Sequence, residues 1–282
     1  TFTGSVYESN AQKVVISYAD SGNSFYGTAV VGTVSGTSIS FGSLTVFANA
    51  GMNGTTYALY DPTTTKIVIA YVDAGSASSF DGTAIVGTVS GTSISFGSPT
   101  VFENSAMTEP AMAYDTISQK VVIVYRNTAN SNHGTAVIGT VSGTSISFGT
   151  PVVFNPATSE QPSVAYDATA EKVVIGYTNA AISNKGSAIV GTVSGTSISF
   201  GSALDFSAGQ VASLIATYDS AAGKVVMAWR GVANAGSSVV FTVGGGNLSS
   251  FVGITDAAIS DTASGSVTIK GGISSNVSSL TP

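Results

Sequence analysis

The stretch GTVSGTSISFG runs from Gly32 to Gly42, and it recurs unchanged at Gly87–Gly97, Gly139–Gly149 and Gly191–Gly201. A second motif, a lysine before an apolar run that ends in an aromatic residue, begins at Lys13, Lys66, Lys120, Lys172 and Lys224. Successive lysines are 53, 54, 52 and 52 residues apart. A fixed period of this length indicates tandem copies of one supersecondary unit. The fifth copy keeps only a degenerate form of the long motif, from Val243 to Phe251.

Each copy predicts four β-strands, A to D. In the third copy these are Ala111–Tyr114, Lys120–Tyr125, Thr135–Val141 and Ser145–Phe154, the last interrupted near Gly149 and Pro151. A polar loop from Arg126 to His133 joins strands B and C, and Ser142-Gly143 supplies the tight turn between C and D. Apolar residues alternate with serines along strand D, which is the pattern of a half-buried strand.

Strand B is apolar on both faces, as in Val121–Ile123, and such a run predicts a strand covered on both sides. One face carries large residues and the other small ones, so neighbouring copies can interdigitate. The aromatic residue at the end of strand B is expected to be buried between copies in every case: Tyr18, Tyr71, Tyr125, Tyr177 and Trp229.

Four-stranded units in radial array predict an all-β fold, a five-bladed β-propeller of four-stranded blades. A solenoid would need a shorter repeat, and tandem sandwiches would need about seven strands per domain. We expect the ring to close by side-chain packing of the last blade on the first, with the N-terminal segment leading into strand A. The expected propeller is 1–254, with blades at about 1–47, 55–102, 110–154, 162–206 and 213–252, and 255–282 is a C-terminal extension that begins a further module.

Charged residues make up only 9% of the chain, against about a quarter in typical domains, and the net charge is −6. Nucleic-acid binding needs clustered Lys and Arg, so no nucleic-acid partner is expected. No apolar run is long enough for a membrane helix, so no membrane insertion is expected either. The absence of cysteine excludes disulfides and thiolate sites.

The two faces of the expected disc differ. The A–B and C–D turns are nearly constant among the copies, and the aspartates that lead the A–B turns (Asp61, Asp115, Asp167 and Asp219) are interpreted as turn caps rather than metal ligands. The B–C loops and D–A connections vary, which is typical of recognition on a constant scaffold, although unconstrained drift would look the same. The candidate ligand-binding residues are Asp20, Phe25, Tyr26, Asp73, Phe80, Asp81, Arg126, Asn127, Asn132, His133, Asn179, Asn184, Lys185 and Arg230.

No catalytic residue, metal site or cofactor is predicted. A glycosidase needs two carboxylates at a defined separation, and the candidates are scattered among loops: Asp20, Asp73, Asp81, Glu103, Glu109 and Glu160. The single histidine, His133, has no serine and aspartate pattern to complete a triad. The chain is therefore not expected to be an enzyme.

The unit KVVIxY, a polar loop, GTAVVGTVSGTSISFG and a VF ending resembles repeats in tail-fibre and virion structural proteins of marine bacteriophages. The segment from Phe251 to Pro282 resembles the part of those proteins that comes directly after the repeats. The resemblance implies a virion or extracellular protein without an active site. Three hypotheses remain open: an adhesin that binds a cell-surface glycan or envelope component, a structural spacer that binds only virion proteins or copies of itself, and a glycoside-active enzyme.

Overall fold

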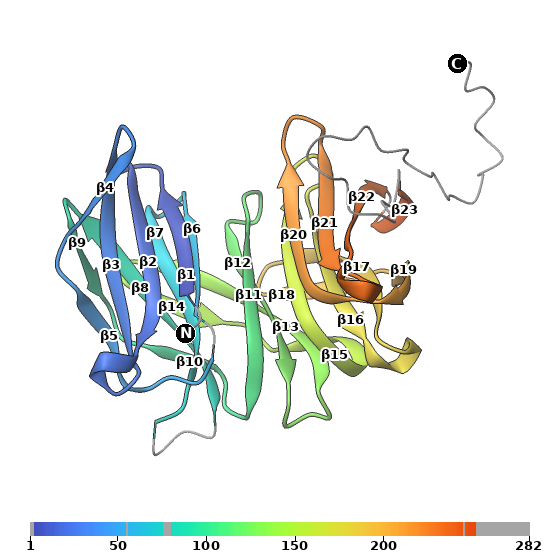
Figure 1. The fold of residues 1–282 in the computed structure, drawn as a ribbon, viewed down its shortest axis with the longest axis horizontal. Coiled ribbons are helices and arrows are strands. Elements are labelled where there is room, and N and C mark those ends of the chain that lie inside the picture. The colour runs from blue at the N-terminus through green and yellow to red at the C-terminus, as the bar shows by residue number, and fades with distance from the viewer. Residues whose placement is uncertain (1–2, 55, 76–79, 245, 252–282) are drawn as a thin grey trace.

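The structure is a computed structural model, and it describes residues 3–54, 56–75, 80–244 and 246–251. Within these residues the chain forms 23 β-strands and three short 3-10 helices, and no α-helix occurs there. The predicted all-β class is confirmed. Figure 1 shows the strands in successive groups along the chain. We refer to the five copies of the repeat as unit one to unit five, and units three and four share one nine-stranded sheet. The expected C-terminal extension, 255–282, lies outside the described residues.

Strands A and B of each unit form an antiparallel pair, and strand B begins at the repeated lysine. The A strands are β1 (Thr3–Glu8), β6 (Tyr57–Asp61), β11 (Met107–Asp115), the second part of β15 (Val152–Asp167) and β20 (Ala212–Asp219). The B strands are β2 (Lys13–Asp20), β7 (Lys66–Asp73), β12 (Lys120–Asn127), β16 (Lys172–Asn179) and β21 (Lys224–Arg230). The N-terminal segment is thus strand A of unit one, as expected.

Strand C pairs with strand B on one side and with a divided strand D on the other. The C strands are β3 (Tyr26–Ser35), β8 (Asp81–Ser90), β13 (His133–Ser142), β17 (Lys185–Ser194) and β22 (Gly236–Gly244). The first parts of D are β4 (Ser38–Phe41), β9 (Ser93–Phe96), β14 (Ser145–Phe148), β18 (Ser197–Phe200) and β23 (Asn247–Phe251). The second parts are β5 (Thr45–Gly51), β10 (Thr100–Glu103), the start of β15, and β19 (Leu204–Gln210). The expected interruption of strand D is present.

The strands extend further into the expected loops than the sequence predicts, as unit three shows. Arg126, Asn127 and His133 lie in strands β12 and β13 rather than in a loop, because the polar residues continue the ladder up to the Asn127–His133 pair. Strand D of unit three runs directly into strand A of unit four as β15, which pairs with β13 up to Thr158 and with β16 from Ser159. No D–A loop exists there.

Successive units pack face to face through the large and small faces of strand B. Val15 and Ala19 of unit one share an apolar cluster with Ile69 and Tyr71 of unit two. Equivalent clusters join units two and three, three and four, and four and five. The interdigitation that the sequence predicts therefore builds the core between units.

The described residues do not close a ring. None of the four clusters joins unit five to unit one. Tyr18 of unit one, expected to be buried, is only half-buried, whereas Tyr125 is 0% exposed. The reason is that Tyr18 lies on the face that a preceding unit would cover. Closure of unit five on unit one is thus not found in this part of the chain, and the five-bladed ring remains a prediction.

The constant turns are built as expected. The Asp115 carboxylate accepts hydrogen bonds from the backbone N–H groups of Ile117 and Ser118 at 3.0 Å each. The equivalent aspartates of units two, four and five cap their turns in the same way. Among the described residues, no helix has the length and apolar character to cross a membrane.

Candidate functional site

The B–C loops end on a residue with left-handed backbone geometry, at the same place in each unit. We call these residues the loop tips: Phe25 (φ 59), Phe80 (φ 65), Asn132 (φ 60), Asn184 (φ 60) and Asn234 (φ 59). In the first four units the tip carbonyl accepts a backbone N–H from the segment that joins this unit's strand D to strand A of the next unit, for example Val211 N to Asn184 O at 2.9 Å. The tip backbone is therefore held by the sheet while its side chain varies.

Two of the tips carry an aromatic side chain that faces solvent. Phe25 is 56% exposed and Phe80 is 46% exposed. Asparagine tolerates the left-handed region, but a bulky residue there is strained, and such strain clusters at functional sites. Units one and two thus hold exposed phenyl rings where units three to five hold amides.

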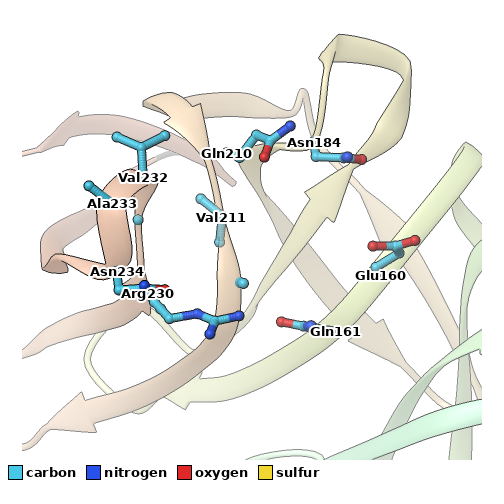
Figure 2. Close-up of a pocket in the computed structure, with 11 residues that line it drawn as sticks. Glu160, Gln161, Asn184, Gln210, Val211, Arg230, Val232, Ala233 and Asn234 are labelled. Carbon is cyan, nitrogen blue, oxygen red and sulfur yellow. The ribbon is translucent and has the colours of Figure 1, made fainter.

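A cavity of about 320 Å³ lies between units four and five on the same face. Figure 2 shows the Arg230 and Gln161 side chains turned toward one another across it, with Glu160, Asn184 and Asn234 around its wall. The cavity is thus lined by a guanidinium, a carboxylate and several amides. Its size lies at the low end of the range for small-molecule sites.

A second cavity of about 470 Å³ lies between units two and three. Arg126 lines it, with Nε 3.9 Å from Glu109 Oε2 and 3.1 Å from Thr108 Oγ1, and Nη1 3.7 Å from Glu160 Oε1. Arg126 and Arg230 occupy equivalent positions, six residues after the repeated lysine. Two equivalent arginines therefore line two cavities on one face.

Bulged residues of the A strands connect these cavities. The Gln161 N–H donates to Glu109 Oε2 at 2.8 Å, and the Gln161 side-chain oxygen accepts from the Ser213 N–H. Glu109, Gln161 and Ser213 all have positive φ and sit one unit apart. These hydrogen bonds run from unit to unit, so Glu109 and Gln161 both line the cavities and hold neighbouring units in place.

Repeat equivalence sorts the fourteen candidate residues into four groups. Four of them are the last residues of their B strands and cap the loop that comes next: Asp20, Asp73, Asn127 and Asn179. Four are loop tips: Phe25, Phe80, Asn132 and Asn184. Four are the first residues of strand C: Tyr26, Asp81, His133 and Lys185. The remaining two are the cavity arginines Arg126 and Arg230.

Each cap residue uses a side-chain oxygen in local structure, and its role in ligand binding stays a prediction. Asp20 Oδ1 accepts the Gly22 N–H at 2.9 Å, and Asn127 is buried, with its side-chain amide donating to Glu103 at 2.8 Å. The spacing of seven residues from the repeated lysine would have identified all four caps. Sequence reasoning also left out Gln210 and Thr108, which line the cavities.

The carboxylates considered for catalysis also have structural partners. Glu103 accepts hydrogen bonds from Tyr125 Oη at 2.9 Å and Ser105 Oγ at 2.6 Å. Burial, together with the nearby Glu103 carboxylate, raises the pKa of the Tyr125 phenol well above its usual range. In the described part of the chain, no group of three or more His, Cys, Asp or Glu residues could hold a metal ion.

No protein-family model and no curated protein matches the chain. Among solved structures, it is similar to the BP39L lectin of Burkholderia pseudomallei, with 11% identity and a TM-score of 0.64 over 88% of this chain and 68% of that chain. It is also similar to the lectin AAL of Aleuria aurantia in complex with Fucα1-6GlcNAc, with 12% identity and a TM-score of 0.55 over 91% of this chain and 79% of that chain. At these identities the similarity shows a fold shared with lectins.

Proposed function

We propose that the chain is a non-catalytic carbohydrate-binding protein that uses the face formed by the B–C loops and the D–A connections. The observation that carries the proposal is the pair of strained, solvent-facing phenyl rings at Phe25 and Phe80. Aromatic rings stack on the apolar faces of sugars, and a folded protein gains no core stability from holding them in solvent. The amide and arginine groups on the same face supply hydrogen-bond donors and acceptors for hydroxyls.

The fold shared with two lectins supports the same ligand class. Together with the likeness of the repeats to phage tail-fibre proteins, it leads us to propose a virion surface adhesin that attaches to a host cell-surface glycan. A spacer without a ligand is the alternative, and glycan binding by the intact chain separates the two.

The test is a glycan array probed with the intact chain, followed by titration of the best glycan. We expect binding to a defined set of glycans. Phe25→Ala and Phe80→Ala should each weaken it by about 2- to 10-fold, because an aromatic contact contributes on the order of 0.5–1.5 kcal/mol. Ile117→Ala is the control, since Ile117 is 63% exposed on the A–B turn of the opposite face. Binding lost equally with Ile117→Ala, or no glycan bound at all, would favour the spacer.

A further inference from the structure

An aromatic contact repeats at every formed interface between successive units. A phenylalanine of strand D lies against the strand B aromatic residue of the next unit, with ring centroids 5.0–5.5 Å apart. The four pairs are Phe47–Tyr71, Phe102–Tyr125, Phe154–Tyr177 and Phe206–Trp229. Each of these phenylalanines also lies near a second aromatic ring of the next unit, such as Phe96 for Phe47 at 5.5 Å. The next unit therefore offers a socket of two aromatic rings.

A backbone contact repeats beside this socket. A Cβ added at Gly42 would lie 1.8 Å from the carbonyl oxygen of Thr92 in the next unit, and the same holds for Gly97 with Thr144 and Gly149 with Thr196, at 1.9 Å. Only glycine fits this approach. The contact joins the last glycine of GTVSGTSISFG in one unit to the turn threonine of the same motif in the next, so it recognises another copy of the repeat.

Unit one carries the receiving half of this interface without an occupant among the described residues. Ile39 is 42% exposed, whereas the equivalent Ile94, Ile146 and Ile198 are each 4% exposed. Phe41 is 54% exposed and Tyr18 is half-buried, although these two residues are equivalent to the rings of the socket. In the described part of the chain no glycine approaches Thr37 as Gly42 approaches Thr92.

Unit five carries the opposite half. Its Ala228 is exposed and Val226 is half-buried. The equivalent residues of unit two, Ala70 and Val68, are 0% exposed because unit three covers them. Among the described residues, the small-residue face of unit five and the large-residue face of unit one therefore both lack a covering unit.

We propose that the open face of unit one is a docking surface for one further β-unit of this same repeat, carried by another stretch of polypeptide. That unit places its strand D phenylalanine between Tyr18 and Phe41 and the last glycine of its motif against Thr37. The large-residue face of this docked unit matches the open small-residue face of unit five. The inference rests on continuity with four formed interfaces of the same chain, and it does not depend on the proposed sugar binding.

The test uses the full chain and, as probe, a polypeptide of residues 107–158, one copy of the repeat with Gly149 and Phe154. We expect a one-to-one complex by native mass spectrometry, with slower amide exchange in β2 and β4. Tyr18→Ala in the chain and Gly149→Val in the probe should each weaken binding by about tenfold or more. This corresponds to a loss of binding free energy on the order of 1.4 kcal/mol. Thr150→Val in the probe is the matched control, because Thr150 is exposed beside Gly149.

A second experiment does not require the isolated repeat to fold by itself. Fusing the same copy ahead of residue 3 should slow amide exchange in β2 and β4 and raise the melting temperature, and the fusion with Gly149→Val should do neither. Slow exchange in β2 and β4 of the unaltered chain would mean that its own residues cover the face, and would overturn the proposal. Failure of both the probe and the fusion to protect these strands would overturn it as well.

Discussion

At the scale of single residues, the constant letters of the repeat are explained by contacts between units. Gly97 must be glycine because the Thr144 carbonyl of the next unit occupies the space of a side chain. The equivalent Gly42 and Gly149 meet the Thr92 and Thr196 carbonyls of their next units in the same way. The sequence repeats these residues because each copy meets the next copy in the same way.

Replacing Gly97 with alanine should lower the free energy of unfolding by about 1–3 kcal/mol, since the new methyl group overpacks a rigid backbone contact. Urea denaturation of the variant would measure this loss. Ser98→Ala is the control, because Ser98 is the exposed neighbour and its change should stay within about 0.5 kcal/mol. Equal stability of the two variants would contradict the contact.

Truncation of the strand B aromatic should have a different effect in unit one and in unit three. Tyr125→Ala removes a fully buried ring and leaves the Glu103 carboxylate without the hydrogen bond from this phenol, so we expect a loss of about 3–5 kcal/mol. Tyr18→Ala should lose clearly less, because its ring is only half-buried. Thermal or urea unfolding of the pair measures the difference, and similar losses would indicate that unit one is covered.

At the scale of elements, the B–C loops share a plan although they differ in length and sequence. A cap residue ends strand B in units one to four, a tip residue with positive φ comes after it in every unit, and strand C begins shortly beyond the tip. Because the sheet holds the tip backbone, the side chain can change from phenylalanine to asparagine without changing the loop. The backbone conformation of the tip is therefore kept while its side chain varies.

Phe80→Asn should separate stability from binding. Asparagine is better suited to the left-handed backbone than phenylalanine, so the variant should gain about 1 kcal/mol of unfolding free energy. The same variant should bind the array-selected glycan more weakly, because the exposed ring is gone. Urea denaturation and glycan titration would measure the two effects. Asn132→Ala is the control for the loop itself, and a Phe80→Asn variant that is less stable than the parent would show that the ring has a structural role.

At the scale of the whole molecule, stability resides in the interfaces between units, as in other repeat proteins. Each formed interface buries one aromatic residue of strand B, and burial raises the pKa of Tyr177 to about 12. The pKa of Tyr71 is also raised well above its usual range, first by burial and then by the Asp73 carboxylate. Loss of the phenol protons at alkaline pH should therefore weaken the interfaces between units.

The free energy of unfolding should therefore fall at alkaline pH. An unfolded tyrosine loses its proton near pH 10, whereas folded Tyr177 keeps it to about pH 12. The folded state binds more protons in this window, so the stabilisation is complete below pH 10 and is lost as pH rises through 12. Urea midpoints at several pH values, with phenolate absorbance, would measure this loss. Tyr177→Phe should show a shallower fall, and an equal slope in both proteins would contradict the assignment.

The sequence by itself determined the period and the all-β class, and it predicted four strands for each unit and a constant and a variable face. These features are set by local pattern, because alternation and turn residues specify strands wherever the unit is placed. The large-residue and small-residue faces of strand B could also be predicted, since the residues that form them occur in each copy.

Only the tertiary structure decided which candidate side chains face solvent and which cap a loop. The sequence gives no reason to separate Asp20 from Phe25. In the structure Asp20 caps a loop and Phe25 faces solvent, and backbone geometry sets this difference. Arg126 and Arg230 share a repeat position, yet among the described residues only Arg126 forms ion pairs with Glu109 and Glu160. The residue equivalent to Glu109 in unit five is Ser213, which carries no charge. Ring closure depends on how each unit is turned against the next, and identical repeats carry no local signal for the number that completes a circle.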